Sequence, residues 1–381
     1  MAKNRLYGIG EPVWLRDSQG EIDGPQAVEI MDAIGFGSFR EWMHLPWVLE
    51  NPTTPKPEVV RRMTQILDKC AELDIEVTGM SHHWFLPEGC KHTSGGVSPD
   101  RDLSSGSLYM QMLEMLEQSW FTMVSQFPQV PMWEVGNEWN IFFLSRDDAK
   151  PLPNGMHGST ENFTLSQRAD IAVDMMYFAA KGIRRANPNA KVVMFSPCPN
   201  QEDLPWFVPA GYGIALMMDM IYSRIRSGDF WSTETDDYFD VVAWHPYTTH
   251  DAPPDDVWKE INDAAYRVMQ KYGDGHKKVL ITEFGYTDSG DPEKEKRHAE
   301  YYQRIFAYMQ QMPYIHAFHI FRLFEDARMS ENWKPGMWGG PYEQYFGIFR
   351  EPKNGLTPRT KAIEIQKLIG CKKDLWRFAA K

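Results

Sequence analysis

Short runs of strand-forming residues alternate along the whole chain with stretches of helical periodicity. Eight such runs are present: Leu6–Gly10, Gly37–Met43, Ile75–Met80, Met132–Asn137, Lys191–Ser196, Asp240–Tyr247, Lys278–Tyr286 and His316–Phe321. Between the second and third runs, apolar residues such as Val59, Met63 and Ile66 recur at helical spacing. Strand and helix alternating in this way predict a parallel sheet, and eight units predict a closed (β/α)8 TIM barrel of the α/β class.

The ends of the helical stretches carry their own signals. Thr164 with Gln167 has the spacing of a capping box, and Pro25 falls where the first turn of a helix is expected. Gly35 and Gly273 follow helical stretches, where a left-handed residue commonly ends a helix. These signals agree with the alternation.

The chain length fits a single barrel. The sequence has 381 residues, of which 43% are hydrophobic, and barrels of this kind run from about 200 to over 400 residues. We find no internal repeat, linker or low-complexity run that would divide the chain. We therefore expect residues 1–381 to form one barrel domain.

The loops of the two barrel ends differ in length. Links from helix to strand are short, whereas four links from strand to helix are long and rich in Pro, Gly and Trp: 85–107, 140–163, 198–210 and 323–356. In a barrel these long loops gather at the carboxyl ends of the strands. The sequence therefore predicts a functional site at that end.

The charge balance limits the class of partner. Forty basic and 52 acidic side chains give a net charge of −12, which disfavours nucleic acid or an anionic membrane as the main partner. No apolar stretch has the length of a signal peptide or a membrane span. We expect a cytoplasmic protein, although a trimmed secreted form with an added Met would have the same sequence features.

The cysteines are widely scattered and form no C-x-x-C pair. This pattern predicts reduced thiols in the core rather than a disulfide framework or a zinc site. The four are Cys70, Cys90, Cys198 and Cys371.

Two glutamates end predicted strands. Glu138 lies at the end of the fourth strand and Glu283 at the end of the seventh. Their separation, 283 minus 138 or 145 residues, is close to three-eighths of 381, as expected for strands four and seven of an eightfold barrel. Two carboxyl groups that face one cavity raise the pKa of one of them. Retaining glycoside hydrolysis requires such a pair as acid/base and nucleophile, whereas a single glutamate here could equally bridge to a nearby Arg.

These motifs resemble clan A glycoside hydrolases, which are retaining (β/α)8 glycosidases. The resemblance is carried by Asn137-Glu138 on strand four and Glu283 on strand seven, and it covers most of the chain. It implies that Glu138 is the acid/base, that Asn137 binds the sugar 2-hydroxyl and that Glu283 is the nucleophile. Arg40 is similar to the clan's arginine beside the nucleophile.

Other motifs extend the resemblance. His245 and Tyr247 are similar to a clan histidine and to the tyrosine that orients the nucleophile, and His83-Trp84 resembles the pair that binds the non-reducing sugar in family 1 β-glucosidases. Strand eight lacks the usual Trp beneath the sugar, so that role falls to Phe321 or to a loop tryptophan, Trp333 or Trp338. Families 1, 5 and 39 show partial likeness, and no single family is assigned.

Several supporting residues have a structural alternative. Arg40 could be a surface cation, and His245 could be a core histidine that only supports the acid/base. The adjacent His82 and His83 could suggest a metal, but neighbouring strand residues point to opposite faces, so we expect no metal site there.

We therefore expect a retaining β-glycoside hydrolase that needs no cofactor and acts on a β-linked oligosaccharide or small glycoside. One alternative is a carbohydrate-binding barrel without catalysis, since fold alone does not fix chemistry. Another is a metal-dependent barrel hydrolase that uses His82, His83 and His245. The sequence specifies neither the sugar, nor exo or endo action, nor the oligomeric state.

Overall fold

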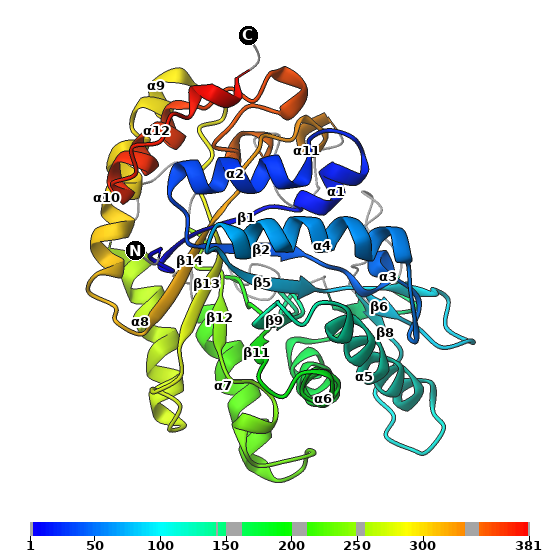
Figure 1. Ribbon diagram of the computed structural model, residues 1–381. Coiled ribbons are helices and arrows are strands. Elements are labelled where there is room, and N and C mark those ends of the chain that lie inside the picture. The colour runs from blue at the N-terminus through cyan, green and yellow to red at the C-terminus, as the bar shows by residue number, and fades with distance from the viewer. Residues whose placement is uncertain are drawn as a thin grey trace.

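The computed structural model describes residues 3–141, 144–149, 162–199, 212–248, 256–331 and 343–379, and a sheet of eight parallel strands forms its centre (Figure 1). The strands are β1 (Tyr7–Gly10), β2 (Ser38–Trp42), β5 (Glu76–Ser81), β9 (Met132–Val135), β11 (Lys191–Met194), β12 (Val242–Trp244), β13 (Val279–Phe284) and β14 (Ile315–Phe321). Each lies within or overlaps one of the eight predicted runs, so the predicted strand count is confirmed.

The strands follow the order β11-β9-β5-β2-β1-β14-β13-β12, which is that of a barrel opened between β11 and β12. A parallel bridge between Val193 and Val241 joins these two edge strands, and the N–H of Met194 donates to the Val241 carbonyl at 2.9 Å. The sheet therefore closes on itself, and the predicted (β/α)8 barrel is confirmed.

Helices surround the barrel in chain order (Figure 1). They are α1 (Val13–Ser18), α2 (Gly24–Ile34), α3 (Leu45–Val48), α4 (Pro57–Glu72), α5 (Leu108–Gln126), α6 (Leu165–Ala186), α7 (Tyr212–Ser227), α8 (Asp256–Lys271), α9 (Pro292–Lys296), α10 (His298–Met309), α11 (Ala327–Glu331) and α12 (Thr360–Ile369). None of the helices in the described ranges is long and apolar enough to cross a membrane.

The predicted helix ends are present. Pro25 lies in the first turn of α2, and Gly35 ends that helix with φ of 105°. Thr164 and Gln167 form the reciprocal hydrogen bonds of a capping box at the start of α6. Gly273, shortly after α8, has φ of 90°. These residues fix where helices meet loops.

Small elements lie in the segments outside the eight barrel strands and the helices. Short strands pair as β3 (Leu49–Asn51) with β4 (Thr54–Pro55), β6 (Trp84–Phe85) with β7 (Ser94–Gly95), and β8 (Val97–Ser98) with β10 (Ser145–Arg146). The 3-10 turns are η1 (Thr235–Asp237), η2 (Glu343–Phe346), η3 (Pro352–Asn354) and η4 (Trp376–Phe378). Of the long loops, 85–107 contains β7, β8 and the end of β6.

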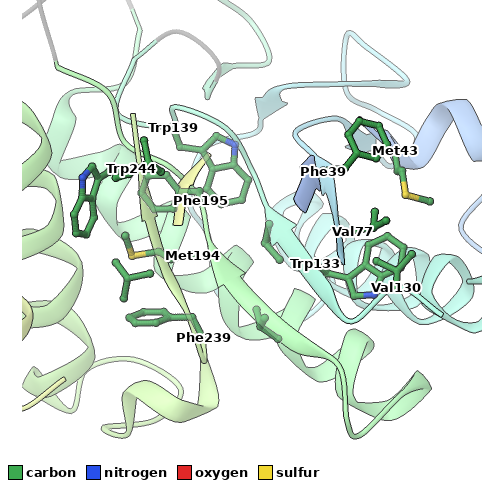
Figure 2. Close-up of a cluster of buried hydrophobic side chains, with 14 of the residues drawn as sticks. Phe39, Met43, Val77, Val130, Trp133, Trp139, Met194, Phe195, Phe239 and Trp244 are labelled. Atoms are coloured by element: carbon green, nitrogen blue, oxygen red, sulfur yellow. The ribbon is translucent and has the colours of Figure 1, made fainter. Parts of the chain in front are cut away.

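Apolar packing occurs in two places. The larger core fills the space between strands and helices, and Figure 2 shows part of it, with Trp139 stacked on Phe195 at 5.2 Å between ring centroids. A smaller cluster fills the barrel interior: Met132, Val193, Val241, Ala243, Leu280 and Ala317. All four cysteines are free thiols, but only Cys70 and Cys198 are buried in the core as predicted, whereas Cys90 and Cys371 are partly exposed. The apolar interior layer forms a floor for the polar residues that follow along the same strands.

Candidate active site

The two predicted catalytic glutamates meet at the carboxyl end of the barrel. Glu138 follows β9, Glu283 lies on β13, and both side chains are almost fully buried. A carboxylate oxygen of each lies within 4.8 Å of the other and of a ring nitrogen of His245. His245 Nδ1 lies 2.7 Å from Glu138 Oε1 and 3.8 Å from Glu283 Oε2. The predicted meeting of the pair is therefore observed.

Irregular backbone turns each glutamate inward. Glu138 has φ of 48°, in the left-handed region, and follows Gly136, whose φ is 96°. A Cβ atom on Gly136 would clash with the Trp139 ring at 2.3 Å. The Glu138 N–H donates to the Ser196 carbonyl at 2.9 Å. Strain of this kind is concentrated at functional sites, where the surrounding structure holds it in place.

On β13 the irregularity is in strand register. The pairing of β13 with β14 shifts between Ile281 and Phe284. Strict alternation would place neighbouring residues on opposite faces, yet Thr282 and Glu283 both reach polar partners inside the barrel end. A shift of register re-aims a side chain in this way.

Arg40 links the residues of this site. It is fully buried, and its Nη1 donates to Glu283 Oε1 at 2.6 Å while its Nη2 donates to Asn137 Oδ1 at 2.7 Å. Its Nε donates to Glu134 Oε2 at 2.6 Å. The alternative of a surface cation is therefore wrong, because a buried guanidinium needs carboxylate partners and has two.

The environments of the two carboxyl groups differ. Burial, together with the nearby Glu283, raises the pKa of Glu138 well above its usual range. Burial also raises the pKa of Glu283, but the Arg40 guanidinium opposes this shift through charge and a hydrogen bond. Glu138 is therefore the group that keeps its proton, and Glu283 is the one that Arg40 stabilises as an anion.

His245 and Tyr247 both lie close to this pair. Burial, reinforced by Arg40, lowers the pKa of His245 well below its ordinary value, so its imidazole is neutral. The Tyr247 hydroxyl lies 3.5 Å from Glu283 Oε2, and burial raises its pKa. His245 thus contacts both carboxylates, and its short contact with Glu138 fits the alternative of a buried histidine that supports the acid/base.

The remaining predicted sugar contacts have mixed outcomes. His83 lies in a cluster with His44 and His82, with ring centroids 4.2 to 4.7 Å apart. Trp84 is buried and donates its indole N–H to the Val97 carbonyl at 3.0 Å. Its ring packs in the core rather than presenting a face to a sugar, which corrects the predicted contact. Trp338 lies outside the described residues.

The histidine cluster also corrects the reasoning about metal. His82 and His83 were expected to point apart, but both follow the end of β5, where strand alternation no longer applies. Nitrogen atoms of His44, His82 and His83 lie within 4.8 Å of one another. Burial lowers the pKa values of His44 and His82, which favours the neutral, ligand-competent form. These three form one group that could hold a metal ion, and Glu138, His245 and Glu283 form a second.

Several residues of the site were missed from the sequence. Glu134 binds Arg40, and Thr282 and Ser196 lie between Glu134 and His245. Trp42, two residues after Arg40 on β2, contacts Phe321 edge-on with centroids 6.0 Å apart. Trp42 lies two residues after Arg40, and Glu134 lies four residues before Glu138. An even spacing along a strand from these recognised site residues could have identified both.

Glu343, on η2, is a further missed residue. Burial and the nearby Glu283 raise its pKa to about 7. The same turn carries Phe346, whose ring meets those of Tyr247 and Phe321 at 6.3 and 5.5 Å. The turn η2 therefore lies on the nucleophile side of the site.

Comparisons with known proteins bear on the fold and on the enzyme class. Residues 225–336 match a family model described as a glycosyl hydrolase catalytic core. No curated protein sequence matches the chain.

Solved structures share the barrel at low sequence identity. A family 39 glycoside hydrolase from the gut symbiont Bacteroides cellulosilyticus is 15% identical, with a TM-score of 0.60 over 97% of this chain and 64% of its own. A β-glycosidase is 11% identical, with a TM-score of 0.62 over 100% and 98%. A family 1 β-glucosidase from Thermotoga maritima, solved with isofagomine lactam, is 13% identical, with a TM-score of 0.61 over 96% and 97%.

At these identities the structures establish the shared fold. The chain spans about two-thirds of the length of the family 39 enzyme and almost the whole length of the other two. The match of residues 225–336 to a glycosyl hydrolase catalytic core confirms the enzyme class predicted from the sequence, a glycoside hydrolase.

Proposed function

We propose that the protein is a retaining β-glycoside hydrolase that acts on β-linked oligosaccharides or small glycosides. The observation that carries this proposal is the spacing of Glu138 and Glu283, whose closest carboxylate oxygens lie within 4.8 Å. Retaining enzymes hold their carboxyl groups about 5 to 5.5 Å apart, whereas inverting enzymes leave about 6.5 to 9.5 Å for a water. An approach of single carboxylate oxygens to within 4.8 Å is compatible with the retaining spacing and supports attack by a carboxylate rather than by water.

Hydrogen bonds distinguish the two carboxylate oxygens of Glu283. Arg40 occupies Glu283 Oε1 at 2.6 Å, so Oε2 is the freer atom for attack on the anomeric carbon. His245 occupies Glu138 Oε1 at 2.7 Å. In the first step, protonated Glu138 gives its proton to the leaving oxygen as Glu283 forms a glycosyl ester. In the second step, Glu138 accepts a proton from the water that cleaves this ester.

Asn137 and the aromatic residues would hold the sugar. Arg40 donates to Asn137 Oδ1, which leaves the Asn137 amide hydrogens as donors to a sugar hydroxyl, as the clan resemblance implies for the 2-hydroxyl. The Trp42 and Phe321 rings are the candidates for the apolar face beneath the sugar.

The stereochemistry of the product tests this proposal. Aryl β-glucosides are the first substrates to test because enzymes of the same fold include β-glucosidases. Proton NMR of the first product formed should show the β-anomer, which then mutarotates. Release of the α-anomer first would contradict the retaining mechanism, and no hydrolysis of any aryl β-glycoside would contradict the proposed function.

A further inference from the structure

A chain of buried hydrogen bonds connects Glu138, the proposed acid/base, to Glu134, one of the two carboxylates that bind Arg40. From Glu138 Oε1 it passes at 2.7 Å to His245 Nδ1, and from His245 Nε2 at 3.0 Å to Thr282 Oγ1. Thr282 then contacts the Ser196 hydroxyl, which donates to Glu134 Oε1 at 2.5 Å. All five side chains are buried.

Counting protons gives this chain a direction. Glu134 accepts from Arg40 at both oxygens, which makes this carboxylate the accepting end. If Ser196 donates its only hydroxyl proton to Glu134, its oxygen is left to accept from Thr282. Thr282, having donated, can only accept from His245 Nε2.

A neutral imidazole has one N–H. If that hydrogen lies on Nε2, the lone pair of Nδ1 faces Glu138 Oε1. A short contact of 2.7 Å between that lone pair and Oε1 then requires the resting proton of Glu138 to lie on Oε1, and the carboxyl group must turn before it gives this proton to a leaving oxygen. The other tautomer would donate to Glu138 and stabilise its ionised form instead.

We propose that Thr282 and Ser196 are positioning residues that hold the His245 proton on Nε2, so that His245 accepts from Glu138 and stabilises its acid form. This inference rests on the proposed role of Glu138 as acid/base. It adds to that role two hydroxyl groups that touch neither substrate nor the reacting atoms. It predicts that the chain sets the alkaline limit of activity.

Other ionisable groups also face this pair. Those near Glu138 are Glu283, Arg40, Tyr247, the Cys198 side chain and Glu343, and those near His245 are Arg40 and His319. A change at Thr282 leaves every one of these groups in place. A shift of the pH profile would therefore report the hydrogen-bond chain.

The test is the pH profile of kcat/KM for an aryl β-glycoside in the full chain. In Thr282→Val, His245 Nε2 loses its acceptor, the ring takes up the other tautomer, and the alkaline limb moves down by about one pH unit. Thr282→Ser should restore the limb. Ser196→Ala should shift it less, because Thr282 also lies 3.1 Å from Glu134 Oε1 and can donate there directly.

Thr78→Val is the matched control. Thr78 lies on β5 and is buried, and its hydroxyl has no hydrogen-bond partner among the described residues. The same loss of one hydroxyl should leave the alkaline limb in place. An unchanged limb in folded Thr282→Val, or no recovery in Thr282→Ser, would overturn the inference.

Two further measurements keep the test decisive. Nitrogen-15 NMR of the wild type should find the His245 hydrogen on Nε2, and a hydrogen on Nδ1 would contradict the inference even if Thr282→Val failed to fold. If a 2-deoxy-2-fluoro glycoside labels Glu283 in the wild type and the alkaline limb of the pH profile is unchanged in Thr282→Val, only the inference is rejected. No labelling of the wild type would reject the proposed function itself.

Discussion

Two layers of the barrel interior differ in chemistry although the same strands build them. Met132, Ala243 and Leu280 belong to the apolar layer, and two residues further along their strands lie Glu134, His245 and Thr282. Residues two apart on a strand share a face, so each strand contributes to both layers. The apolar layer, called the lower layer here, stabilises the fold by burying apolar area. The polar layer, called the upper layer, contains buried charged side chains, whose burial would be unfavourable without the hydrogen bonds that they make to one another. The comparison separates stability from catalysis within one barrel.

The largest expected effect is a loss of turnover in the upper layer. Glu283→Gln should lower kcat/KM for aryl β-glycosides by at least about 10⁴-fold, because an amide oxygen does not replace the carboxylate nucleophile. The amide oxygen can still accept from Arg40, so the melting temperature should change by only about a few degrees. Wild-type rates in this variant would remove Glu283 from the mechanism.

The next effect depends on the leaving group. Glu138→Ala should lower the rate about 10²- to 10⁴-fold for glycosides with poor leaving groups, because general acid assistance is lost. Glycosides with a very good leaving group should form the glycosyl-enzyme at nearly the wild-type rate. Steady-state and burst kinetics on a series of aryl leaving groups measure this difference. An equal loss across the series would argue against Glu138 as the acid.

In the lower layer the expected effect is on stability. Leu280→Ala should lower the free energy of unfolding by about 2 to 5 kcal/mol, because Leu280 is fully buried and truncation leaves a cavity. Urea denaturation measures this change. Leu280→Met keeps the volume and should cost less than about 1.5 kcal/mol. The rate per folded molecule should stay within about tenfold, and a larger loss would show that the layers are not separable.

The smallest effect concerns the third carboxyl group. Burial is the largest cause of the raised pKa of Glu138, and the like charge of Glu283 is the next cause that raises it. Glu343 adds a smaller rise of this pKa, also as a like charge. Glu343→Gln should therefore lower the pKa of Glu138 and move the alkaline limb down by about a few tenths of a pH unit. Because Glu138 must be protonated to act, activity is lost as pH rises through this value. A limb that moves upward would contradict the assigned sign.

The sequence predicted the features that follow from period and chain order. Eight strand-like runs and their helix caps specified the barrel, and glutamates at the ends of runs four and seven had to meet at one end. Arg40 was identified because a charge after an apolar run needs a carboxylate partner. The resemblance to clan A then gave roles to His245 and Tyr247.

The features that the sequence did not predict depend on backbone irregularities and on tertiary packing, which period cannot reveal. Thr282 and Glu283 both contribute to the site because β13 shifts register against β14. His82 and His83 come together because they lie beyond the end of β5. Trp84 was assigned to a sugar contact from its motif, but its burial against Trp139 follows from tertiary packing alone.

Mapping a trapped intermediate tests the central claim most directly. After incubation with a 2-deoxy-2-fluoro β-glycoside, peptide mass spectrometry of the wild type should find one added glycosyl group on Glu283, and Glu283→Gln should stay unlabelled. An adduct on Glu138 or Glu134, or none with any glycoside that the enzyme hydrolyses, would contradict the account.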